Sequence, residues 1–97
     1  MSDDTEEAAF PATLTITLDP PVHFSGKDYT EVTLREPSTQ QFADAQDLGG
    51  IRSVQHLVHV VGGVPKAVAA LIPISKTMQA DAFFAHFTRP APATSRR

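Results

Sequence analysis

The sequence predicts an α+β domain in which an N-terminal antiparallel β-hairpin packs on three or four short α-helices. Two stretches, residues 13–18 and 29–34, alternate apolar and polar side chains, which is typical of half-buried strands. From Ser38 onward the apolar residues recur at intervals of three and four, which is typical of helices. Because an isolated hairpin is only marginally stable in water, we expect the helices to cover its apolar face.

The hairpin is expected over about residues 13–35. Its first strand is rich in threonine and should stop at Asp19-Pro20-Pro21, because proline cannot donate to a ladder. Ser25-Gly26 marks the turn, within a loop longer than the tight two-residue type. The second strand places Val32 and Leu34 on one face.

Four helices are predicted at about residues 38–48, 51–61, 65–72 and 75–87. Ser38 or Thr39 is the expected N-cap of the first helix. Gly49-Gly50 and Gly62-Gly63 should end the first two helices and Pro73 the third, and Ser75 or Thr77 is expected to cap the last one.

Each predicted helix carries an apolar stripe that should face the core. Leu57 and Leu71 are predicted to be core residues. The four stripes, in chain order, are Phe42, Ala45 and Leu48; Val54, Leu57, Val58 and Val61; Val68, Leu71 and Ile72; and Met78, Ala82, Phe83, Phe84 and Phe87.

Residues 12–88 are predicted to form a single domain between two disordered tails. Residues 1–11 are acidic, and residues 89–97 are basic and proline-rich; neither has the apolar periodicity that would offset the entropy lost on ordering. A domain of this size is marginal alone, so a partner or self-association would stabilise it.

Composition argues against several classes of protein. The net charge is −3 and the basic residues of the middle are scattered, which does not favour nucleic-acid binding. The chain has no cysteine, and therefore neither a disulfide framework nor a thiolate zinc site. Its apolar stretches are broken by glycine and proline, and no secretory signal precedes them. We expect a soluble intracellular protein that does not enter membranes.

No residue pattern indicates catalysis, a cofactor or a metal site. His56 and His59 are three residues apart, but solvated histidines on a helix surface explain them better than a metal site that lacks a third ligand. Asp19 and Asp28 are better explained as turn residues than as an acid pair. We therefore do not expect an enzyme.

Arg35 and Glu36 form a charged pair at the junction between the predicted second strand and the first helix, directly before Pro37. They are either a surface strand end followed by a helix-entry acid, or a contact to a partner. The residues alone favour neither interpretation.

The stretch ITLDPPVHFSGKDYTEVTLREPSTQQFADAQ resembles the opening of the phage tail assembly chaperone families. The stretches IRSVQHLVHVVGGVPKAVAALIPIS and MQADAFFAHF are similar to the middle and last helices of these small proteins, which are encoded just before the tape measure gene of long-tailed phages and prophages. The resemblance extends over about residues 14 to 87, with the Arg-Glu-Pro junction as its most telling part.

This resemblance implies a non-enzymatic role in the host cytoplasm. The partners it implies are the tape measure protein and the tail tube protein, together with a longer frameshifted form of the chain itself. The chaperone would keep the tape measure soluble, help the tube polymerise around it, and be absent from the mature virion. The alternative is a structural tail or connector protein that is retained in the virion.

The aromatics of the last helix are the candidate partner-binding residues. Phe83 and Phe84 are adjacent, and we expect that they cannot both face the same core. One of them, or Phe87, should then be exposed and available to a partner or to self-association. Arg35 and Glu36 would be rim residues that set orientation more than affinity.

Overall fold

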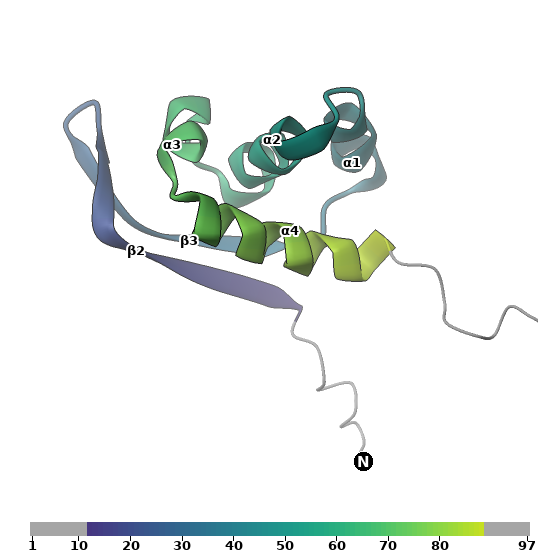
Figure 1. The fold of residues 1–97 in the computed structure, drawn as a ribbon, viewed down its shortest axis with the longest axis horizontal. Coiled ribbons are helices and arrows are strands. Elements are labelled where there is room, and N and C mark those ends of the chain that lie inside the picture. Colours follow the sequence, from purple (N-terminus) through teal and green to yellow (C-terminus); the bar gives the residue numbers. More distant parts are fainter. Residues whose placement is uncertain (1–11, 89–97) are drawn as a thin grey trace, which may run out of the picture.

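The structure is a computed structural model that describes residues 12–88, so the predictions made for residues 1–11 and 89–97 lie outside the described part. An antiparallel hairpin is followed by four helices, which confirms the predicted α+β class (Figure 1). The elements are β2 Thr13–Phe24, β3 Lys27–Arg35, α1 Thr39–Gln46, α2 Gly50–Gly62, α3 Lys66–Leu71 and α4 Ile74–Thr88.

The first strand does not stop at the prolines. The pairing breaks after Thr17, which lies opposite Glu31, and resumes at Val22, which lies opposite Tyr29. Leu18 to Pro21 therefore stand against a single residue of β3, and the missing proline N–H groups interrupt no ladder bond there. Irregularities of this kind bend a strand, and Figure 1 shows the hairpin bending so that its far end stands beside α3.

The turn is shorter than predicted. Phe24 pairs with Lys27, which leaves a two-residue turn formed by Ser25 and Gly26. Both turn residues have positive φ, 52° and 77°, as a type I′ hairpin turn requires. The prediction of a longer loop was wrong because serine rarely adopts positive φ, so Ser25-Gly26 does not resemble the usual Asn-Gly signal.

The helices cover one face of the hairpin. The inward side chains of the two strands are buried aliphatics, among which Leu34 is fully buried. Helix α2 packs on β3, whereas α3 and α4 pack on β2. The other face of the hairpin is polar, with the Thr15 and Thr33 hydroxyls 3.0 Å apart.

Of the two candidate N-caps for α1, the structure selects Ser38. Its hydroxyl accepts from the Gln41 N–H, and the Gln41 side chain accepts from the Ser38 N–H, which is a complete capping box. At α4 the capping prediction was wrong: the helix begins at Ile74, where the Pro73 carbonyl accepts from the N–H groups of Lys76 and Thr77.

Helix α2 is the centre of the core, as its stripe predicted. Val54, Leu57, Val58 and Val61 are all buried. The helix ends where Gly63 adopts the left-handed conformation, with φ 70°. The His59 Nδ1–H donates to the Val64 carbonyl at 2.6 Å, so this partly buried histidine holds the α2–α3 connection and is not simply solvated.

Several residues assigned to the core are exposed. Leu71, the second predicted core leucine, is 55% exposed. The buried side of α3 is centred between Val68 and Ala69, and at about 100° per residue Leu71 lies roughly 110° from that centre. Leu48 follows the end of α1, so it leaves the stripe of that helix. Met78 and Ala82 lie on the outward side of α4.

Gly62 marks the closest approach of α2 to the hairpin. A Cβ built at Gly62 would lie 2.6 Å from the Val32 Cγ1 and 3.3 Å from the Leu34 Cδ2. Overfilling a packed core costs about 1–3 kcal/mol, which outweighs the roughly 1 kcal/mol that replacing a helical glycine by alanine gains. We expect Gly62→Ala to lower the unfolding midpoint in urea.

The control for this prediction removes the Val32 methyl group that a Cβ at Gly62 would clash with. In a Val32→Ala background the clashing methyl group is absent, so Gly62→Ala should then cost less than it does in the native chain. An unchanged or higher midpoint for the single Gly62→Ala variant contradicts the close packing of α2 on the hairpin.

Candidate functional site

Phe83 and Phe84 are both buried, with 4% and 2% of their surface exposed. The expectation that adjacent phenylalanines cannot share a core was wrong. The buried side of α4 includes Thr77, Ala80 and Phe84, which is an arc wide enough for two neighbours about 100° apart to flank its centre. The two rings contact edge to face at 5.7 Å, and Phe87 is only partly buried.

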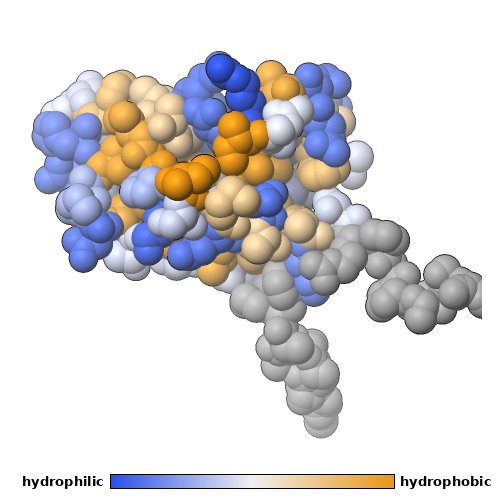
Figure 2. Space-filling view, in the orientation of Figure 1, coloured by the Kyte–Doolittle hydropathy of each residue, from blue (hydrophilic) through white to orange (hydrophobic). Residues whose placement is uncertain are grey.

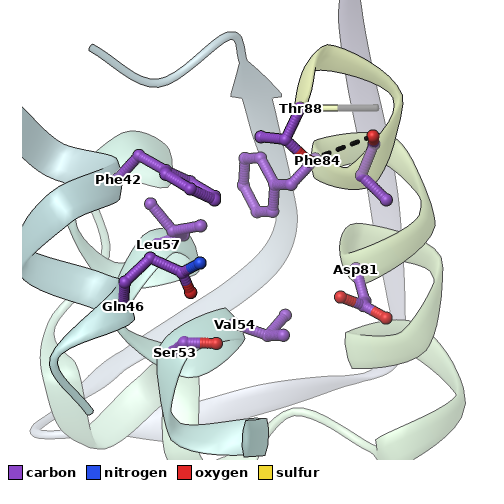
Figure 3. Close-up of a pocket in the computed structure, with 9 residues that line it drawn as sticks. Phe42, Gln46, Ser53, Val54, Leu57, Asp81, Phe84 and Thr88 are labelled. Atoms are coloured by element: carbon purple, nitrogen blue, oxygen red, sulfur yellow. Dashed lines mark hydrogen bonds between the residues drawn. The ribbon is translucent and has the colours of Figure 1, made fainter. Parts of the chain in front are cut away.

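The first surface of interest is a groove between α1 and α4, floored by α2. Figure 3 shows the rings of Phe42 and Phe84 facing one another across a hollow of about 140 Å³. Val54 and Leu57 form the floor, and Asp81 stands on the α4 side (Figure 3). We call this hollow and its neighbour, described next, the α1–α4 groove.

A second hollow of about 160 Å³ adjoins the first, since Phe42 and Thr88 line both. It is also lined by Glu36 and Phe87, which are far apart in the sequence. The fold thus brings three of the five candidate partner-binding residues, Glu36, Phe84 and Phe87, to one groove. Phe83 is a core residue, and the exposed Arg35 is not among the residues that line either hollow.

Among residues 12–88, the charged side chains that line the α1–α4 groove are of one sign. They are the carboxylates of Asp81 and Glu36, and no lysine or arginine of this part of the chain lines either hollow. Aromatic side walls, an aliphatic floor and an acidic rim suit a segment that is apolar and basic.

The second surface was not anticipated from the sequence. Ile51, Ile74 and Met78 are 47%, 63% and 46% exposed, although they are large and apolar. A hollow of about 120 Å³ joins Ile51 and Ile74 to Ala70 and Ile72. We call these five residues the aliphatic face. Figure 2 shows apolar side chains gathered where α3, the start of α4 and the start of α2 meet.

The aliphatic face has a basic border. Gln55 lines both its hollow and a neighbouring one of about 90 Å³, which is lined by Leu48, Arg52, His56 and Lys66. Of the residues that the structure describes, no aspartate or glutamate lines these two hollows. Among residues 12–88, neither Arg52 nor Lys66 forms an ion pair. Over residues 12–88, the two surfaces are therefore lined by charges of opposite sign.

His56 and His59 are the histidine pair that the sequence offers as candidate metal ligands. The rings of His56 and His59 lie 6.3 Å apart, and within residues 12–88 no three histidine, aspartate or glutamate side chains gather closely enough to hold a metal ion. Asp28 contacts His23 at 2.5 Å across the end of the hairpin.

The sequence marks the residues of the aliphatic face as apolar helix residues, but it does not distinguish a core position from a surface position. Ile51 follows Gly50 and Ile74 follows Pro73, so each lies at the beginning of a helix. Met78 lies one turn after Ile74 on the same side of α4. Their apolar character alone predicts that they belong to the core. In the structure they lie outside the buried side of their helices and point outward.

Over residues 12–88, no helix combines the length and apolar character needed to cross a membrane.

A family model described as phage tail assembly chaperone proteins, E, or 41 or 14, matches residues 15–89. The chain therefore belongs to this family of phage tail assembly chaperones, as the resemblance of its hairpin and helices indicated. No curated protein and no solved structure matches it significantly. Membership of the family implies interaction with tail proteins and suggests a role without catalysis.

Proposed function

We propose that this protein binds the tape measure protein of its phage before the tail is built, keeps it soluble, and promotes polymerisation of the tail tube around it. The single observation that carries the proposal is the aliphatic face, on a chain that belongs to a tail assembly chaperone family. Soluble monomers seldom leave contiguous apolar surface uncovered without an interaction to cover it. The action takes place in the host cytoplasm, and the protein leaves before the virion is complete.

The chemistry of the proposed partner fits such a surface. A tape measure protein is long and helical, with apolar seams that would aggregate before a tube encloses them. A small helical domain covers such a seam by receiving it between its own helices. In this scheme the tail tube protein is the second partner and displaces the chaperone as it polymerises. Self-association and a longer frameshifted form would add copies of the same surface along the seam.

Arg35 and Glu36 retain the proposed role of orienting residues. Both are exposed, and Glu36 lines the α1–α4 groove beside Phe87. Rim charges of this kind affect the rate of association and its orientation more than its affinity.

The test follows the protein through assembly. In host cells producing tails, quantitative mass spectrometry should find the chain in the soluble fraction that contains unassembled tape measure protein, and should not find it in purified particles. A fixed number of copies per purified particle contradicts the proposal and supports the alternative, a structural tail or connector protein retained in the virion.

A further inference from the structure

We infer that the aliphatic face is a docking site for an amphipathic helix whose apolar stripe is flanked by acidic side chains. This inference rests on the proposed function and specifies the surface used and the chemistry that it recognises. It is argued from the juxtaposition of Ile51, Ile74 and Met78 with Arg52 and Lys66, two cations that form no ion pair within residues 12–88.

The backbone of this surface requires that the occupant be helical. The face is built from segments of α2, α3 and α4 and from the α3–α4 junction, so it presents no strand edge. A strand laid on such a surface would find no ladder partner for its N–H and C=O groups, whereas a helix satisfies its own.

The hollow at the centre of the face is of a suitable size for one anchor. Its volume is about 120 Å³, and Ile51, Ile72 and Ile74 line it, so it offers a docked helix a place for an apolar side chain. Ile74 and Met78 lie one turn apart on α4, so they continue the apolar surface along the helix that an occupant would follow.

The basic border of the aliphatic face determines which charges should flank the apolar stripe of the docked helix. Arg52 and Lys66 border the face, and within the described part of the chain they form no ion pair and no carboxylate lines the two hollows. On α4 the face ends at Asp81, one turn beyond Met78, which belongs to the α1–α4 groove. An acidic flank over Arg52 and Lys66 is therefore attracted and a basic flank is repelled.

A second copy of the chain is a poorer occupant of the same surface. In a two-fold dimer through this face, each copy would present the same residues to the other. Arg52 and Lys66 would then meet the same two cations at the border of the partner copy's face, where the described residues supply no carboxylate, so the interface would bury like charges together.

The experiment uses two synthetic helical peptides of about 20 residues with the same leucine stripe, one flanked by glutamates and one by lysines. Binding to the full chain is measured by fluorescence anisotropy. The glutamate peptide should bind more tightly than the lysine peptide, and its affinity should fall as salt rises. Equal or tighter binding of the lysine peptide to the native chain overturns the inference.

Three single variants locate the site. Ile74→Ser should weaken binding of the glutamate peptide about tenfold, because it removes a central apolar contact of the kind that dominates binding energies. Phe87→Ser, in the α1–α4 groove, is the matched control and should change the affinity less than about twofold. Arg52→Glu should reverse the preference between the two peptides. If Phe87→Ser weakens binding and Ile74→Ser does not, the helix docks in the other groove and the inference is wrong.

The outcome separates this inference from the proposed function. Coexpression of a tape measure fragment with the native chain, Ile74→Ser and Arg52→Glu tests both together. If the native chain and both variants retain the fragment equally well, the aliphatic face is not the docking site, but the proposed chaperone function still holds. Failure of the native chain to retain the fragment refutes the function itself.

Discussion

Phe84→Ser should unfold most of the protein at room temperature. Phe84 is 2% exposed and packs against Phe83, so the variant loses a buried ring and gains a buried hydroxyl. Truncating a core phenylalanine costs about 3–5 kcal/mol, and a core of this size rarely supplies more than about 3–5 kcal/mol in total. Circular dichroism should show a largely lost helical signal.

The matched control for Phe84→Ser is Met78→Ser. Met78 lies on the same helix but is 46% exposed, so its replacement should leave the circular dichroism spectrum and the melting temperature nearly unchanged. A folded, cooperatively melting Phe84→Ser variant shows that α4 is placed wrongly. The same prediction excludes Phe84→Ser as a test of partner binding, because loss of binding would only report loss of fold.

Leu57→Asp should have an effect of similar size. Leu57 is 3% exposed in the middle of α2, so an aspartate there would bury an unpaired carboxylate or open the helix. Urea unfolding should find no stable native baseline for this variant.

Leu71→Asp is the control for Leu57→Asp because the chemical change is the same. Leu71 is 55% exposed, and the carboxylate would remain in water. This variant should unfold with a midpoint close to that of the native chain. Equal destabilisation by the two variants contradicts the orientation that the structure gives to α3.

The sequence predicts the buried side of an element correctly where the spacing of its apolar residues repeats over several turns. Helix α2 has 13 residues, and all four of its stripe residues are buried. Helix α3 has six residues, too few to distinguish Leu71 from the buried arc by spacing alone. In β2 the two prolines predicted the end of the strand. The strand continues because Leu18 to Pro21 lie opposite a single residue of β3, and this register cannot be read from the sequence.

The candidate site was predicted in part, for a related reason. Apolar side chains in a short helix indicate burial, but they do not say whether this chain or another covers them. Ile74 was therefore overlooked, and Phe84 was assigned to a partner although it belongs to the core. The approach of Glu36 to Phe87, and the separation of acidic from basic surfaces, arise only when α1 and α4 pack around α2.

The central claim is that this protein binds unassembled tape measure protein through an apolar surface. Coexpression of the tagged native chain with a tape measure fragment, followed by affinity capture, tests it most directly. We predict that the fragment is soluble and captured with the native chain, and that it is insoluble when expressed alone. A fragment that is never captured, at low salt or at high salt, contradicts the claim.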